Sequence, residues 1–297
     1  WSSDVCSSDL KAIERLGLDN IDDNLKERPN SFLLQFGETI SSEFAKAYLM
    51  KPKFAELHED GDIHIHDMDF LAMGTTTCMQ IDLNKLFKNG FSTGHGHLRE
   101  PQSINSYSAL AAIAIQSDQN DQHGGQSIPA FDFYMAPGVL KSFKKEYKQA
   151  LYELLDYTDF ISFINFDKLT KEIDKLGSIE FDIGGFKNFY KESKEVRNIF
   201  EKAYDIALSK TDRATYQAME AFVHNLNTMH SRAGAQVPFS SINFGTDTSP
   251  EGRMVMKNYL LSIDAGLGKN ETPIFPISIF KIKEGINYNP GDPNYDL

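Results

Sequence analysis

The chain of 297 residues has a composition close to ordinary globular usage, with 41% hydrophobic and 24% charged residues, which argues against disorder and against a membrane protein. A net charge of −12, with no basic stripe that carries interleaved aromatic residues, argues against binding to DNA or RNA as a polymer. No apolar run approaches the ~18 residues of a membrane-spanning helix and no secretion signal opens the chain, so we expect a cytoplasmic protein without a membrane partner.

The first ten residues, WSSDVCSSDL, are rich in serine and show neither a helical nor a strand period. We interpret residues 1–10, and with them Cys6, as a non-native leader outside the fold. Residues 11–297 are interpreted as one α/β domain, because predicted strands alternate with predicted helices along them.

The segment PNSFLLQFGETISSEFAKAYLM, which begins at Pro29, predicts a helix. Its residues Phe36, Ile40, Phe44 and Tyr48 recur every four positions, which is the spacing of one helix face. We expect this face to pack in the core.

The stretch GDIHIHDMDF alternates Ile63 and Ile65 with His64 and His66. A period of two is typical of a strand, so two histidines are expected on one side near a strand end. The following segment, GTTTCMQIDL, predicts another strand, which carries Cys78.

Loops and helices alternate in the middle of the chain. The glycine-rich stretch NGFSTGHGHLREP predicts a shaped loop, and the alanine-rich residues 104–116 predict a helix. The stretch NDQHGGQSIPAFDFYMAPG predicts a second glycine-containing loop, followed by a short aromatic strand. Residues 141–215 predict a solvated helical layer with a break at Gly184 and Gly185.

The segment FVHNLNTMHSRAGAQVPFSSINFGTD predicts a helix that ends at Gly234 as its C′ residue and then a buried strand over residues 237–244. Ser249 and Pro250 are the N-cap and N1 residues expected at a helix start. The stretch PIFPISIFKIKEG is rich in β-branched residues and predicts a final strand.

Histidines gather in three polar segments, which contain His64 and His66, His95 and His97, and His123. Imidazole is the commonest metal ligand in proteins. However, HxH pairs on strands also serve structural hydrogen bonding, and no set of carboxylates accompanies these histidines. We therefore expect no metal site in this chain.

Cys78 is the only cysteine outside the leader, so a disulfide framework and a CxxC zinc site are not expected. A lone cysteine is usually a small apolar core residue, whereas a reactive thiol needs a basic partner such as His64 or His66. A Cys–His hydrolase is an alternative, although no hydrolase signature surrounds Cys78. The residues by themselves leave its role open.

Five motifs occur in the chain in this order: GDIHIHDMDF, GTTTCMQIDL, GGQSIPAFDF, AGAQVPFSSINFGTD and PGDPNYDL. Over residues 11–297 the sequence resembles the anaerobic (class III) ribonucleoside-triphosphate reductases, which are glycyl-radical enzymes that make deoxyribonucleotides. The resemblance implies an α/β fold that forms the amino-terminal part of a ten-stranded barrel, with residues 141–215 as a helical elaboration. It also implies a ribonucleoside triphosphate as substrate.

The resemblance implies a role for Cys78 as the barrel-strand cysteine that assists the reduction at C2′ of the ribose. It places imidazoles and backbone N–H groups at the substrate, although a Gly-Gly pair also suits an ordinary tight turn. The residues expected at the substrate are His64, His66, Gly124, Gly125, Gln126 and Ser127.

The family binds ATP or deoxynucleotide effectors at a dimer interface, which implies a homodimer. In this chain the effector region is expected around Glu100 and Gln116, and lysines after Val139 are further candidates. Residues 104–115 also suit a helix that is simply packed.

The thiyl cysteine, the glycyl-radical segment with its zinc-binding cysteines and the ATP-cone are expected to lie outside this chain, which by itself should be inactive. The implied cofactors are a glycyl radical, installed by an activating enzyme with S-adenosylmethionine and an iron–sulfur cluster, and a structural zinc ion. Two alternatives remain. A glycyl-radical enzyme of the pyruvate formate-lyase type is disfavoured because its reactive cysteine lies on the central loop, and the other alternative is a non-catalytic nucleotide-binding module.

Overall fold

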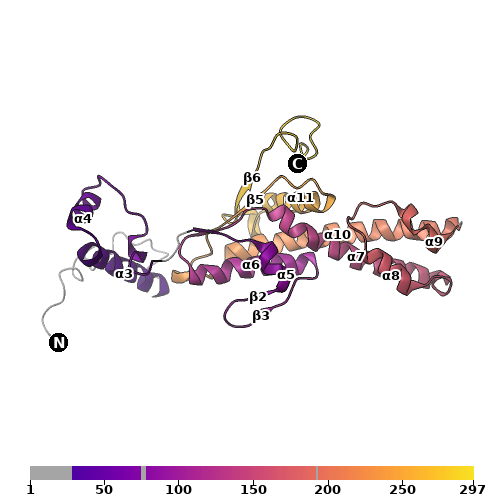
Figure 1. Ribbon diagram of the computed structural model, residues 1–297, viewed down its shortest axis with the longest axis horizontal. Helices are drawn as coiled ribbons and strands as arrows, with labels where there is room; N and C mark the ends of the chain where they lie inside the picture. Colours follow the sequence, from indigo (N-terminus) through magenta and orange to yellow (C-terminus); the bar gives the residue numbers. More distant parts are fainter. Residues whose placement is uncertain (1–28, 75–77, 192) are drawn as a thin grey trace. The chain divides into compact units, whose positions relative to one another are not determined.

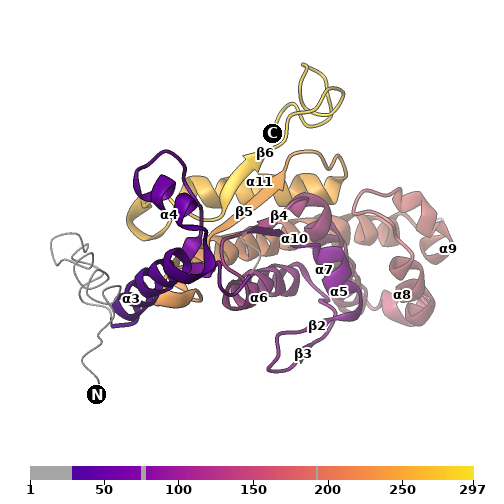
Figure 2. The ribbon, with the colours of Figure 1, turned by 60° about the vertical axis from the view of Figure 1, so that its left-hand side comes forward.

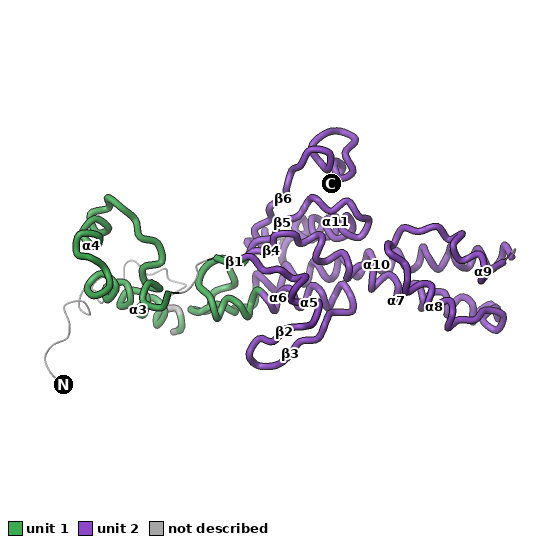
Figure 3. The backbone as a smooth tube through the Cα atoms, viewed as in Figure 1, with its two compact units in different colours: residues 1–79, 115–126, 228–239 green, residues 80–114, 127–227, 240–297 purple. Residues whose placement is uncertain are grey.

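The computed structural model describes residues 29–74, 78–191 and 193–297. The chain divides into two compact units, which Figure 3 colours separately. Unit 1 comprises residues 1–79, 115–126 and 228–239, and unit 2 comprises residues 80–114, 127–227 and 240–297. Among the described residues, no helix is both long and apolar enough to cross a membrane.

Unit 1 is built around helix α3, which contacts η3 and η6. Its elements are α3 (Pro29–Phe44), the π-helix η2 (Ala45–Leu49), α4 (Pro52–Glu59) and the 3-10 helices η3 (Met68–Phe70) and η6 (Ala233–Ala235).

The predicted helix after Pro29 is confirmed, but its buried face is wrong in part. Phe36 and Ile40 are half-buried, whereas Phe44 and Tyr48 are 46% and 67% exposed. At Ala45 the helix widens into η2, and a π-helical turn holds more residues than an α-helical turn. The row of residues spaced by four therefore rotates away from the core at this point.

The strand predicted at Ile63 and Ile65 is wrong. The chain turns here, because Ile63 N donates to the carbonyl oxygen of Leu57 at 3.2 Å and Ile65 N donates to Nδ1 of His58 at 3.2 Å. Both N–H groups donate to residues of α4, so they are not available for the hydrogen bonds of a strand.

The remaining elements lie wholly or mainly in unit 2. They are β1 (Cys78–Gln80), α5 (Leu83–Asn89), β2 (Phe91–Ser92), β3 (His97–Leu98), α6 (Ile104–Asp121), β4 (Gly125–Ile128), α7 (Phe131–Tyr157), η4 (Phe160–Phe163), α8 (Phe166–Asp174), η5 (Ile183–Phe186), α9 (Lys187–Tyr190), α10 (Lys194–Thr228), β5 (Ser240–Phe244), α11 (Pro250–Ala265), η7 (Gly268–Asn270) and β6 (Ile277–Phe280).

The main sheet has four strands in the order β1-β4-β5-β6. Strands β5 and β6 are parallel, with Ser241 opposite Ile277 and Phe244 opposite Phe280, and Figure 2 shows them side by side beside α11. Since a parallel pair needs a crossover, α11 fills that connection. The predicted α/β class is confirmed, and the predicted glycine-rich loop contains a small antiparallel hairpin, β2–β3.

The aromatic strand predicted after the second glycine-containing loop is wrong, because FDFYMAPG forms the first turns of α7. Phe131, Met135 and Val139 recur every four positions and are fully buried. Pro137 lies inside this helix, where it removes one backbone hydrogen bond. Burial of the apolar row therefore outweighs the local cost of the proline.

The predicted helical layer over residues 141–215 is confirmed, and it consists of α7, α8, α9 and α10 (Figure 1). The predicted break at Gly184 is the 3-10 helix η5. The core between α7, α10 and α11 is aromatic. The ring of Phe131 lies 5.1 Å from that of Phe222 and 5.9 Å from that of Tyr259.

The last predicted elements are confirmed except at Gly234. Helix α10 already ends at Thr228, and Gly234 lies in η6 with φ of 75°. A Cβ at Gly234 would lie 2.5 Å from Cδ2 of Leu34, a contact that a shift of the leucine side chain could relieve, so glycine is favoured here chiefly by its left-handed backbone. Ser249 caps α11 by accepting from the backbone N–H of Gly252 at 3.0 Å.

Candidate functional site

Cys78 is the first residue of β1, it is exposed, and its thiol is free. The predicted strand is thus confirmed, and a role as a buried apolar residue is not. The threonines that precede Cys78, residues 75–77, lie outside the described residues. Among the described residues no hydrogen bond joins Cys78 to His64 or His66, so the predicted proximity of thiol and imidazoles stays a prediction.

The predicted histidine pair lies beside a third imidazole. The rings of His64 and His66 are 6.0 Å apart in an edge-to-face arrangement, and His64 lies 5.6 Å from the ring of His58. His66 is largely exposed and its Nδ1 lies 2.7 Å from Oδ2 of Asp67. Of the two predicted histidines, His66 is the one that contacts a carboxylate.

Asp67 connects His66 to His123, a residue that the sequence placed only near the Gly-Gly motif. Oδ1 of Asp67 lies 3.1 Å from Nε2 of His123, and both side chains are mostly buried. Asp67 holds this position with φ of 50° and ψ of 42°, a left-handed conformation that most non-glycine residues avoid and that aspartate tolerates better than they do. This turn and the contacts to His66 and His123 together fix the carboxylate between the two imidazoles.

The ring of His123 is fixed on three sides. Phe70 stacks on it with ring centres 3.8 Å apart, Asp67 bonds Nε2, and Nη2 of Arg232 lies 3.5 Å from Nδ1. Because an arginine only donates, Nδ1 is the acceptor and Nε2 carries the proton that bonds Asp67. Contacts to both ring nitrogens and to one face thus set the orientation of the His123 ring.

Arg232 and Glu38 complete the cluster around His123. Arg232 donates to Oε1 of Gln236 at 2.9 Å and covers the ring of Phe239 at 4.0 Å. Burial lowers the pKa of Arg232, which the nearby carboxylates, Glu38 first, oppose. Burial and the charge of Asp69 raise the pKa of Glu38. Both shifts reflect charges held away from water.

In the Gly-Gly segment, Gly125 begins strand β4, whereas Gly124 lies in the bend that precedes it, so the predicted loop is shorter than expected. Gly124 has φ of 99° and its carbonyl oxygen accepts from Nε2 of Gln119 at 2.7 Å. Gln126 N donates to the carbonyl oxygen of Phe239 at 2.8 Å, so this N–H is already used. The Gln126 side chain is 1% exposed, and neither of its amide atoms has a hydrogen-bond partner.

Asp132 is a buried residue that the sequence did not point to, and it organises the turn after β5. Its Oδ2 accepts from the backbone N–H groups of Gly245, Thr246 and Asp247 at 2.9, 3.0 and 3.0 Å. Three consecutive N–H groups that converge on one oxygen form an anion-binding nest. The sequence GTD after a predicted strand is the only signal that marks it.

Two asparagines of the carboxyl-terminal segment dock on the same turn. The amide groups of Asn287 and Asn294 donate to the carbonyl oxygen of Gly245 at 2.8 and 3.2 Å. Oδ1 of Asn294 accepts from Arg253 of α11 at 2.8 Å, and Arg253 also bonds both oxygens of Asp296 at 2.9 and 2.7 Å. The PNYDL motif is thereby attached at the carboxyl end of β5.

Residues 22–297 match the family model of the anaerobic ribonucleoside-triphosphate reductase. The chain belongs to this family. Its relatives include the anaerobic ribonucleoside-triphosphate reductases of Escherichia coli, with 30% identity over 260 residues, and of enterobacteria phage T4, with 30% identity over 261 residues. The alignments cover 87% of this chain but 30% and 35% of these relatives, so the chain spans about a third of their length.

A solved structure supports the same fold. The anaerobic ribonucleotide reductase from Thermotoga maritima, in complex with dATP and CTP, matches with a TM-score of 0.56 at 12% identity, over 94% of this chain and 41% of that one. The fold and the family model agree with the resemblance carried by the five motifs. The family model also favours the reductase over the pyruvate formate-lyase type.

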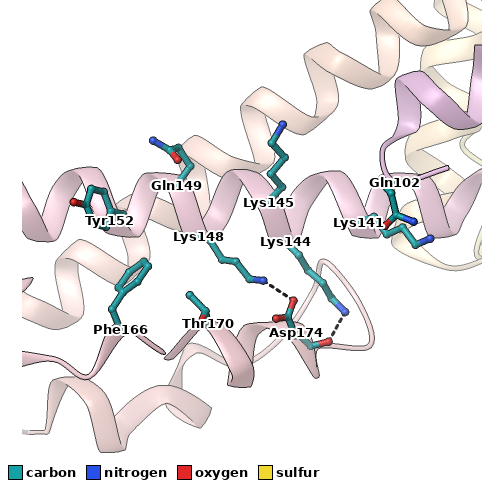
Figure 4. A pocket seen from close by; sticks show the side chains of 10 residues that line it. All are labelled: Gln102, Lys141, Lys144, Lys145, Lys148, Gln149, Tyr152, Phe166, Thr170 and Asp174. Atoms are coloured by element: carbon teal, nitrogen blue, oxygen red, sulfur yellow. Dashed lines mark hydrogen bonds and ion pairs between the residues drawn. The ribbon is translucent and has the colours of Figure 1, made fainter. Parts of the chain in front are cut away.

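The predicted effector region of this family member borders a groove of about 640 Å³ on α7 and α8. Glu100 accepts from Nζ of Lys141 at 2.6 Å. Figure 4 shows Lys144 and Lys148 reaching toward Asp174, where they donate to its backbone and carboxylate oxygens at 2.8 and 2.5 Å. Gln116 does not line this groove.

The groove holds more cations than anions. Lys141, Lys144, Lys145 and Lys148 line it together with one carboxylate, Asp174. Burial lowers the pKa of Lys144, which Asp174 opposes and Lys148 reinforces. An added anion would offset this excess of positive charge. The rings of Tyr152 and Phe166 lie 5.5 Å apart at the same groove.

Proposed function

We propose that the intact protein reduces ribonucleoside triphosphates to 2′-deoxyribonucleoside triphosphates without oxygen, with Cys78 as a reacting thiol. The single observation that carries this proposal is the match of residues 22–297 to the reductase family. The free, exposed cysteine in the motif GTTTCMQIDL supports the role of a reacting thiol. An exposed thiol at a strand end is accessible to a substrate, which a core cysteine is not.

The chemistry requires a hydrogen donor. Reduction at C2′ replaces a C–OH bond by C–H and releases the hydroxyl group as water, so it consumes two electrons and two protons. The S–H bond of Cys78 supplies one hydrogen atom, that is one electron and one proton. An external reductant of the formate or dithiol class supplies the second electron and proton and restores the Cys78 thiol. The glycyl radical that the family implies supplies the oxidising equivalent that starts the reaction. His64, His66 and the segment Gly124–Ser127 are the proposed substrate contacts.

The proposed contacts differ in what supports them. His66 is exposed and paired with Asp67, so its ring is oriented and still accessible. In the Gly-Gly segment, Gln126 N is engaged by Phe239, and the buried amide of the Gln126 side chain is the stronger candidate. An unpaired buried amide costs free energy unless a ligand bonds it.

The effector site is proposed for the lysine groove beside Glu100. The related Thermotoga maritima protein has dATP in its specificity site, and a nucleotide triphosphate suits four lysines that adjoin an aromatic pair. Titration of dATP into the intact protein tests this. Lys144→Ala is expected to weaken dATP at least tenfold, whereas Lys171→Ala, on the same helix as Asp174 but outside the groove, leaves the affinity unchanged.

A homodimer and a radical-generating activating enzyme are further parts of this proposal. Sedimentation of the intact protein, with and without dATP, tests the dimer. Anaerobic mixing with the activating enzyme and S-adenosylmethionine, followed by electron paramagnetic resonance, tests the partner.

The role of Cys78 is tested by Cys78→Ser in the intact protein. The variant is expected to form the glycyl radical to the wild-type level but to produce no deoxynucleotide, because Cys78 acts after the radical has formed. Loss of the radical signal together with activity would show that Cys78 supports folding or activation instead. A variant that still makes deoxynucleotide would exclude Cys78 from the reaction.

A further inference from the structure

A cavity of about 220 Å³ lies beside His123 in unit 1. At ~30 Å³ per water molecule this space corresponds to about seven waters, and it is smaller than the ~300 Å³ at which pockets begin to enclose drug-sized ligands. The cavity therefore has the size of a sugar ring rather than of a whole nucleoside triphosphate. Its wall joins apolar and polar side chains: Leu34, Phe70 and Met73 with Gln122, His123 and Arg232.

Gln122 has no partner for its amide group. The residue is 6% exposed, and both Oε1 and Nε2 lack a hydrogen bond within the described structure. The other glutamine at the cavity, Gln119, is satisfied: Nε2 donates to Gly124 and Oε1 accepts from Phe239 N at 2.9 Å. Of the two glutamines, Gln122 is thus the one with an unpaired amide in the described structure, and an amide matches a hydroxyl group, which both donates and accepts.

His123 offers a second hydrogen-bonding atom. Asp67 accepts a hydrogen bond from Nε2–H of His123, which leaves Nδ1 as an acceptor. The distance of 3.5 Å between Nδ1 and Nη2 of Arg232 is at the upper limit for a hydrogen bond. A ligand hydroxyl at Nδ1 would make a shorter bond. The stacked ring of Phe70 keeps the imidazole in place.

The charges around the cavity exclude a phosphate group. Glu38 and Asp121 line the cavity together with the single guanidinium of Arg232, and Asp67 and Asp69 add negative charge near that guanidinium, so an added anion meets an excess of negative charge. A metal ion is not favoured either, because no group of three or more metal-binding side chains occurs in the described part of the chain. A neutral group with hydroxyls fits the size, the charge and the unpaired atoms.

We propose that this cavity binds the ribose hydroxyls of the nucleotide, with Gln122 and His123 as hydrogen-bond partners and Asp67 as the positioning residue of His123. This inference rests on the proposed function, which supplies a ribonucleotide as ligand. It assigns ribose recognition to residues outside the motif-predicted set, since Gln122, His123 and Asp67 were not among the expected substrate contacts.

The inference is tested by calorimetric titration of CTP and of 2′,3′-dideoxy-CTP into the intact protein. The wild type is expected to bind CTP at least tenfold more tightly. Gln122→Ala and His123→Ala should each weaken CTP about tenfold, as expected for one lost hydrogen bond to a buried group, and leave the dideoxy analogue unchanged. Asn120→Ala is the matched control, because Asn120 lines the same cavity but its amide is exposed and bonds the carbonyl oxygen of Gln116.

The variant Asp67→Asn tests whether Asp67 positions the His123 ring, without disrupting the local fold. Asparagine tolerates the left-handed backbone of residue 67, so the turn is retained. The wild type should show a single Nε2–H tautomer of His123 in imidazole ¹⁵N spectra, and the variant a mixture of tautomers together with weaker CTP binding.

Three outcomes overturn the inference. If the wild type binds CTP and the dideoxy analogue equally, the cavity does not read the ribose, although the proposed function stands. If folded Gln122→Ala and His123→Ala bind CTP as the wild type does, these residues are not its partners. If the wild type binds no ribonucleotide at all, the inference and the proposed function fail together.

Discussion

Replacing Asp132 with alanine is expected to destabilise unit 2 by about 3 kcal/mol, because one buried oxygen serves three backbone donors. Asp132 is fully buried, and Gly245 and Asp247 are buried as well, whereas Thr246 is half-buried. A buried donor that loses its partner costs ~1–3 kcal/mol. Two such donors give ~2–6 kcal/mol, and relief of the desolvated carboxylate reduces this sum.

The assay is urea unfolding followed by far-ultraviolet circular dichroism, combined with hydrogen exchange of the amides at residues 245 and 247. Since ~1.4 kcal/mol corresponds to a factor of ten, a loss of about 3 kcal/mol predicts exchange at these amides that is on the order of a hundredfold faster. The midpoint of unfolding should fall while the denaturant slope is unchanged, which indicates a change in stability alone.

Two control variants make the result specific. Asp132→Asn retains one acceptor oxygen of the same shape and should lose about half as much stability, whereas Asp156→Ala, at an exposed position on the same helix, should stay within ~0.5 kcal/mol of the wild type. A folded Asp132→Ala variant within ~1 kcal/mol of the wild type, with unchanged exchange at residue 247, would refute the assignment of a nest.

Glu38→Gln should stabilise the protein at pH 7 and have no effect near pH 4. The pKa of Glu38 is raised above its ordinary value of 4.5. The folded state therefore loses stability as the pH rises from 4.5 through the raised pKa. An equal effect of the substitution at both pH values in thermal unfolding would contradict this. Arg253→Ala should speed amide exchange over residues 285–297, with Arg253→Lys intermediate, because the charge-assisted hydrogen bonds from Nη2 to both oxygens of Asp296 are lost. Unchanged exchange would show that other contacts hold the segment. Ile279→Lys should raise the monomer fraction of the 297-residue chain in size-exclusion chromatography. Ile277 and Ile279 are 56% and 43% exposed on the terminal strand of the sheet, and an exposed apolar edge strand can pair with a second copy. An unchanged monomer fraction would locate any self-association elsewhere.

The sequence predicted elements whose signals are local. Ser249 and Pro250 mark the start of α11 because capping depends on adjacent residues. Residues 104–116 predicted α6 for a similar reason, since alanine-rich runs favour helix without help from packing. The strand at residues 237–244 was also found, although β5 begins later, at Ser240.

Elements that depend on distant partners were mispredicted. The period of two at Ile63 and Ile65 suggested a strand, but the N–H groups bond α4 instead. The aromatic run at Phe131, which follows a glycine-containing loop and contains Pro137, suggested a short strand, yet residues spaced by four along it are buried against the rest of unit 2. A short window does not reveal which period wins, because tertiary burial decides it.

The candidate site shows the same difference between local signals, which the sequence reveals, and long-range contacts, which it does not. Family motifs drew attention to His66 and to Gln126, whereas the bond between Asp67 and His123 joins residues that are 56 positions apart. No local pattern predicts that pairing. Gln122 carries no signal in the sequence, because its importance comes from having an amide that is buried and unpaired.

The central claim, that this chain is part of a ribonucleotide-reducing enzyme, is tested most directly by product formation. The intact protein, loaded with its glycyl radical under anaerobic conditions, is incubated with each of the four ribonucleoside triphosphates and a reductant, and deoxynucleotides are quantified by chromatography. The account predicts multiple turnovers of deoxynucleotide from at least one substrate, with none from Cys78→Ser. A fully radical-loaded wild type that forms no deoxynucleotide from any of them would contradict it.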